Sequence, residues 1–179
     1  MNRSLFISIH LYLSSFFAAV VVLVAFSGGM YLLGVKGSLE TTEVAQIKGG
    51  AALMADPSKE AVLTALDGAG IANFSFDYVI TRGDTLFTRP TSRTHYGLTV
   101  DGDTVTVSRN EPSFQKRMQE LHFGHGPSMY REFQKVFAAG LLFIILSGVW
   151  LGLSSSRLRV RTLISAGSGL ILFLALVMS

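Results

Sequence analysis

Long apolar runs near both ends of the chain enclose a middle segment in which apolar and polar residues alternate. Residues 4–35, 136–156 and 162–179 carry no formal charge. A helix crosses the hydrocarbon core of a bilayer in about 20 residues, so the first two runs are long enough and the third is just sufficient. The first run is longer than the apolar part of a secretory signal, and no small-x-small cleavage site follows it. The pattern predicts three transmembrane helices, the first of them uncleaved.

The middle segment predicts a small helix packed on an antiparallel sheet. Asp56 and Pro57 suit the cap and the first position of a helix, and apolar residues then recur with helical spacing through residues 57–69. Alternating apolar residues follow in four short runs separated by turn residues, which predicts a four-stranded meander. The four runs are residues 73–80, 84–89, 94–100 and 103–109.

Residues 113–127 predict an amphipathic helix followed by a break. Phe114, Met118 and Leu121 form an apolar stripe between polar residues. The glycines and the proline of residues 124–127 then interrupt the helix just before the second apolar run. The helix is therefore expected to lie along the outer membrane surface.

The fold class that these patterns predict is an α+β membrane protein with three transmembrane helices and a small extracytoplasmic domain. The predicted division has five parts. They are the first transmembrane helix (1–35), the extracytoplasmic domain (36–112), the interfacial helix and break (113–127), the second transmembrane helix (128–156), and the basic connector with the third helix (157–179).

The distribution of charge predicts how the chain is oriented. All twelve acidic residues lie between Glu40 and Glu132, whereas the connector at residues 154–161 carries three arginines. Short basic connectors stay in the cytoplasm, so the N-terminus and this connector are expected inside and residues 36–135 outside. In a bacterium this means an inner-membrane protein with a periplasmic domain, and the lipid bilayer is its first expected partner.

The residue content and motifs of the chain exclude several classes of cofactor, partner and reaction. The chain has no cysteine, which excludes disulfides, iron–sulfur clusters and covalently attached haem c. Its basic residues are dispersed, so nucleic acid is not an expected partner. Zinc is not expected, because no acidic residue accompanies the histidines at ligand spacing. Nucleotide-binding and hydrolase motifs are absent, and no catalytic constellation is assigned.

Small residues on the spans favour close helix packing. Gly148 and Gly152 form a G-x-x-x-G motif on the second span, and Ser165 with Gly169 forms a small-xxx-small pair on the third. Such residues let helix backbones approach each other. The pattern fits internal packing of the three helices, and it also fits a homo- or hetero-oligomer with other membrane subunits.

The order of motifs resembles that of the PepSY-associated transmembrane proteins. The motifs are His10 near the start of the first span, SGGMYLL at its end, LHFG-x-G, and the glycine-rich AAGLLFIILSGVWLGL. The resemblance covers most of the chain and is most specific over residues 113–153. It implies that residues 57–109 form a PepSY-like domain. Some larger members of the family are inner-membrane haem b proteins that reduce ferric siderophores, and others neighbour flavin-transfer systems. They have four or more spans, whereas this chain has three.

The resemblance makes His122, His10, His125 and Met30 the candidate haem b ligands. His10 lies near the cytoplasmic end of the first span and His122 at the outer end of the second. About 30 Å of hydrocarbon separates these levels, so His10 and His122 cannot share one iron within a monomer. Partners for an outer haem would be the other outer histidine, Met30, Met178 or a second copy of the chain.

Structural roles compete with ligation for each histidine. Glycine-flanked histidines often cap a helix or bind carbonyls freed by a chain break, and His10 also suits an interfacial polar position. His95 is expected to be a solvated strand residue.

Two functions follow from the sequence and the resemblance. The first is an accessory or electron-transfer subunit linked to iron, haem or flavin redox chemistry in the cell envelope. The second is a non-redox membrane-anchored PepSY module that regulates or holds an extracytoplasmic protease or another envelope partner.

Overall fold

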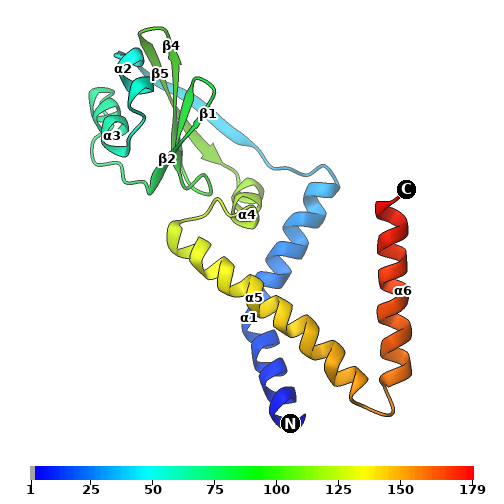
Figure 1. Ribbon diagram of the computed structural model, residues 1–179. Coiled ribbons are helices and arrows are strands. Elements are labelled where there is room, and N and C mark those ends of the chain that lie inside the picture. The colour runs from blue at the N-terminus through cyan, green and yellow to red at the C-terminus, as the bar shows by residue number, and fades with distance from the viewer. Residues whose placement is uncertain (1–2) are drawn as a thin grey trace. The chain divides into compact units, whose positions relative to one another are not determined.

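The computed structural model describes residues 3–179 and confirms an α+β chain with three long apolar helices and a small antiparallel sheet (Figure 1). The helices α1 (Arg3–Leu32), α5 (Ser128–Leu153) and α6 (Arg159–Val177) are each long and apolar enough to cross a membrane. Residues 1 and 2 of the predicted first segment lie outside the described residues.

The chain divides into two compact units. A helical unit contains residues 1–21 and 135–179, and a mixed unit contains residues 22–134. The mixed unit therefore includes the last third of α1, the whole sheet and the first turns of α5.

The mixed unit is built on a five-stranded antiparallel sheet, so the prediction of four strands was wrong by one. The additional strand, β1, pairs with β5 from Leu39 opposite Pro112 to Lys48 opposite Thr104. Most of its side chains are exposed, so it lacks the apolar alternation that identifies a half-buried strand. The strands are β1 (Leu39–Lys48), β2 (Tyr78–Arg82), β3 (Thr85–Arg89), β4 (His95–Asp101) and β5 (Thr104–Pro112), in the order β1-β5-β4-β3-β2.

One face of the sheet forms the hydrophobic core with two short helices, α2 (Gly50–Ala55) and α3 (Lys59–Gly68). Val62 and Leu66 of α3 are fully buried against sheet residues such as Leu98. The predicted cap at Asp56 was wrong, because the hydroxyl of Ser58 accepts the hydrogen bond from the backbone of Ala61 and begins the helix there.

The opposite face of the sheet is polar and is covered by α4 (Phe114–His122). The strand alternation directs Phe87 and His95 to this face, away from Leu86 and Leu98. His95 is only 4% exposed, so its predicted solvation was wrong. It is buried because α4 covers it, and its Nδ1 lies 2.9 Å from the carbonyl of Arg93.

The side of α4 that is buried in the protein is polar. Phe114 is 74% exposed, whereas Gln119 and Glu120 are buried. Gln119 donates a hydrogen bond to the carbonyl of Val35, just after α1. Polar partners, and not an apolar stripe, therefore decide which side of α4 faces the protein.

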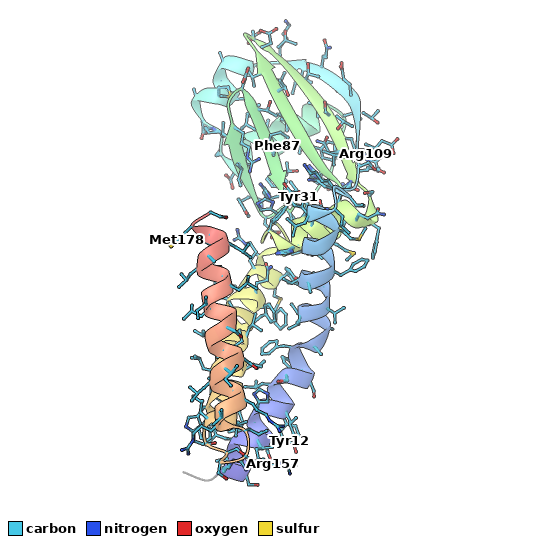
Figure 2. The ribbon with its side chains drawn as sticks, turned by 90° about the vertical axis from the view of Figure 1, so that its right-hand side faces the viewer. Tyr12, Tyr31, Phe87, Arg109, Arg157 and Met178 are labelled. Carbon is cyan, nitrogen blue, oxygen red and sulfur yellow. The ribbon has the colours of Figure 1, made fainter. Side chains whose placement is uncertain are left out.

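Small residues pack α1 against α5 in the helical unit. A Cβ added at Gly140 would collide with the ring of Phe17, which also makes an edge contact with Phe137. Gly152 packs in the same way against Thr162 of α6. These contacts support internal packing, and they leave α6 without a buried residue. Figure 2 shows Tyr12 and Arg157 at one end of this unit and Met178 at the other.

Truncating Leu66 to alanine should destabilise the mixed unit by about 2–5 kcal/mol, because it leaves a cavity among fully buried side chains. Hydrogen exchange of the β4 and β5 amides in the detergent-solubilised chain measures the loss. Asp67→Ala, at the exposed neighbouring position of α3, is the matched control and should leave the protection unchanged. Equal protection in both variants would contradict the assigned core.

Candidate functional sites

His122, the last residue of α4, forms a close pair with Ser27 of α1. The Nδ1 of His122 lies 2.9 Å from the hydroxyl oxygen of Ser27. Ser27 is 2% exposed, and its hydroxyl donates a 3.3 Å hydrogen bond to the carbonyl of Val24. A Cβ at Gly28 would lie 3.1 Å from the Cε1 of His122, so the glycine permits this approach. Ser27 therefore binds the imidazole of His122, and Gly28 provides the space in which the ring packs.

His10 has the same environment at the other end of α1. Its Nδ1 lies 2.9 Å from the hydroxyl oxygen of Ser147 on α5. The hydroxyl of Ser147 donates a 3.1 Å hydrogen bond to the carbonyl of Ile144. A Cβ at Gly148 would lie 3.2 Å from the Cε1 of His10. The two histidine–serine pairs thus share their geometry although they belong to different units.

In each pair Nδ1 is the ring nitrogen that faces the serine, and Nε2 lies outside the pair. A serine hydroxyl has one proton, and a carbonyl one turn earlier in the helix can accept it. In the tautomer in which the serine donates to that carbonyl, Nδ1 donates to the serine oxygen, and Nε2 keeps a lone pair that can accept a proton or bind a metal ion. Both rings are partly accessible.

The predicted chain break after α4 is confirmed, and it separates His125 from His122. The helix α4 ends at His122, Gly124 adopts a positive φ of 77°, and α5 begins at Ser128. The Nδ1 of His125 lies 2.7 Å from a carboxylate oxygen of Glu120, whereas His122 faces Ser27. The two histidines therefore have different partners. Among residues 3–179, no group of three or more histidine, cysteine or acidic side chains could hold a metal ion.

Glu120 is the centre of a charged cluster beneath the polar face of the sheet. Its carboxylate accepts a 2.5 Å hydrogen bond from Thr91 and pairs with Lys116 at 3.0 Å. Arg89 lies 4.0 Å away, a looser contact. Burial acts to raise the pKa of Glu120, but hydrogen bonds from Thr91, Lys116 and His125 outweigh it and lower the pKa to about 2. Glu120 is thus held ionised.

The two methionines proposed as ligands have unlike positions. Met30 is half-buried on α1, one turn after Ser27, and so lies near the face of α1 that receives His122. Met178 caps α6 in the helical unit and is 84% exposed. Met30 and His122 both belong to the mixed unit, whereas Met178 does not. Ligation by either methionine stays a prediction.

Sequence reasoning missed the serines and the cluster around Glu120. A signal was present for the serines, because a Ser-Gly dipeptide occurs on each histidine-facing helix, at Ser27 and at Ser147. A polar residue next to a glycine within an apolar helix indicates a close polar neighbour. For Glu120 the sequence offered no comparable signal, because its partners come from distant strands.

Comparisons with protein-family models, with curated proteins and with solved structures give no match for this chain. The sites therefore have to be interpreted from their own geometry.

Replacing Gly28 with alanine should weaken the packing of the His122 ring against α1. The added methyl group forces the imidazole to move by a few tenths of an ångström, which should lower stability by about 1 kcal/mol. The melting temperature in detergent and hydrogen exchange of α4 measure this effect. Gly29→Ala is the matched control, because nothing lies within 4 Å of its Cβ and alanine is the better helix former. If the Gly29 variant were as destabilised as the Gly28 variant, the packing of His122 against Gly28 would not contribute to stability.

Glu120→Gln should destabilise the mixed unit in a pH-dependent manner. The pKa of Glu120 is lowered in the folded state, so its contribution is complete above the unfolded value of about 4.5 and is lost as the pH falls toward about 2. A shift of this size corresponds to roughly 3 kcal/mol. Melting temperatures of both proteins should therefore converge over this acidic range. Glu111→Gln, on the exposed end of β5, is the control, and a constant gap for Glu120→Gln would contradict the cluster's role.

Proposed function

We propose that the protein is an integral protein of the bacterial inner membrane that serves as an accessory or electron-transfer subunit and binds haem b. The observation that carries this proposal is the repeated histidine–serine pair. His10 and His122 are each held through Nδ1, which leaves Nε2 outside the hydrogen-bonded pair. Imidazoles that bind metals are oriented in this way by a hydrogen bond from the other ring nitrogen.

The residues fit one axial position of a haem at each of the two pairs. His122 would hold the iron at the outer level and His10 at the inner level. A second axial ligand for the outer haem could come from Met30, and for either haem from another subunit. When bound, haem b supplies one-electron transfer. The chain's own contribution is to fix each imidazole and to place it beside an apolar helix.

The proposed orientation rests on the basic connector. Arg157 lies between α5 and α6, and Arg159 and Arg161 lie in the first turn of α6, in a position where positive charge favours the cytoplasmic side. The sheet and His122 would then be periplasmic. Electrons could enter or leave at the outer pair, linked to iron, haem or flavin chemistry in the envelope.

The haem proposal is tested by a dithionite-reduced minus oxidised spectrum of the protein expressed with ample haem and purified in mild detergent. An α-band is expected. His122→Ala and His10→Ala should each remove the part of the band that comes from its own haem, because alanine supplies no ligand nitrogen. Absence of any α-band in the haem-replete wild type would reject the proposal.

Two further variants separate ligation from folding. Ser27→Ala keeps the Nε2 of His122 but removes its orienting partner, so it should reduce haem occupancy without abolishing it. Tyr12→Ala changes an exposed side chain of α1 close to His10 and should leave the spectrum unchanged. Equal loss of the band in Tyr12→Ala would indicate misfolding.

A groove on the side of the sheet that carries α2 and α3 favours a second candidate function. This open groove of about 580 Å³ runs between α2, α3 and the edge strand β1. An exposed edge strand can pair with an extended segment of another protein, with side chains entering an adjacent groove. The non-redox alternative is therefore a PepSY-like module that holds an extracytoplasmic protease or another envelope partner.

Site-directed crosslinking distinguishes this alternative from the haem proposal. A photo-crosslinker at Thr64, which lines the groove, should capture a defined partner in cells, and one at Asp67 on the same helix should not. Capture by a haem-free protein would favour the binding module.

A further inference from the structure

A small charged cavity lies between the polar face of the sheet and α4. Its volume is about 150 Å³, below the range of about 300–1,000 Å³ typical of drug-sized ligands but several times that needed for one water molecule. All of its lining belongs to the mixed unit. The lining residues are Leu39, Arg82, Phe87, Arg89, Thr91, His95, Lys116, Glu120 and His125.

Positive charge exceeds negative charge in this lining. Arg82, Arg89 and Lys116 are cationic, and Glu120 is the one acidic residue among them. The carboxylate of Glu120 is already engaged by Thr91, Lys116 and His125. Little of its charge is therefore left to neutralise the guanidinium groups.

Arg89 is the cation in this lining that most clearly lacks a sufficient counter-charge. Its side chain is 4% exposed, and it donates one hydrogen bond to Thr91. Its Nε has no hydrogen-bond partner although it is fully buried. Burial lowers the pKa of Arg89, as expected for a guanidinium with incomplete counter-charge. A buried cation of this kind favours an anionic partner.

Two hydrogen-bond acceptors line the same cavity. Glu120 is ionised, and the Nδ1 of His95 faces the carbonyl of Arg93, which requires a proton on that nitrogen and leaves Nε2 as an acceptor. Burial lowers the pKa of His95, which favours this neutral form. An anion that also carries a proton matches these groups better than a fully deprotonated one.

We propose that the cavity binds a small free oxyanion that retains a proton, with hydrogen phosphate as the type ligand. Arg89 at the base and Arg82, exposed at the mouth, supply charge-assisted hydrogen bonds that suit a tetrahedral oxyanion. Glu120 and His95 accept the ligand's proton in a hydrogen bond. A lipid phosphodiester carries no proton near neutral pH, so it lacks the donor that Glu120 and His95 would accept. This assignment is independent of haem.

Calorimetric titration of the full chain in neutral, lipid-free detergent tests the proposal. Inorganic phosphate should bind near neutral pH, where it keeps at least one proton. Sulfate at equal ionic strength carries none and should bind roughly tenfold or more weakly, because it places lone pairs against Glu120 and His95. Equal binding of the two ions, or no binding of phosphate, would overturn the proposal.

Variants connect the binding to the cavity. Arg82→Gln changes an exposed side chain, so the protein should fold, and phosphate affinity should fall roughly tenfold. Arg109→Gln on the exposed side of β5 is the matched control and should bind as the wild type does. Phosphate affinity that is the same in Arg82→Gln as in the control would place the binding elsewhere and reject the site. The titration is read as heat of binding and is unaffected by haem content.

Discussion

A polar side chain that is buried on an apolar helix and shielded from water needs a hydrogen-bond partner within the protein. The structure meets this constraint twice with the same set of groups. An imidazole meets a serine hydroxyl, the serine meets a carbonyl of its own helix, and a neighbouring glycine leaves room for the ring. One such pair joins α1 to α5, and the other joins α1 to α4. It also leaves one ring nitrogen of each histidine available for chemistry.

The two faces of the sheet follow opposite physical rules. On one face, apolar residues of α3 such as Leu66 exclude water, and shape and volume govern the packing. On the other, α4 is held by Glu120, which accepts a hydrogen bond from Thr91 just after β3, so hydrogen bonds and charge govern the contact. A buried polar contact is specific, because each group needs its own partner in a defined direction. The core face thus provides stability, and the α4 face provides the charged cavity.

Elements with a strong local signal were predictable from the sequence. The three apolar helices and the break at Gly124 follow from composition and turn residues, and the strands β2 to β5 follow from alternation. The strand β1 could not be recognised, because an edge strand with exposed side chains is specified by its pairing with β5. His95 was misjudged because the residues that bury it lie in α4, beyond the strand's own pattern. The candidate ligands were identified as single residues, whereas their serine partners required the fold.

The first and last strands of the sheet are neighbours, and this has a consequence for the evolution of the chain. Ser38 and Ser113 exchange backbone and side-chain hydrogen bonds where β1 begins and β5 has ended. The chain therefore enters the sheet after α1 and leaves it before α4 at the same place. The segment between Ser38 and Ser113 contains the whole sheet together with α2 and α3. Changes in the turns between the strands therefore leave the spacing of α1 and α4 intact, whereas Glu120 ties changes in α4 to the loop that follows β3.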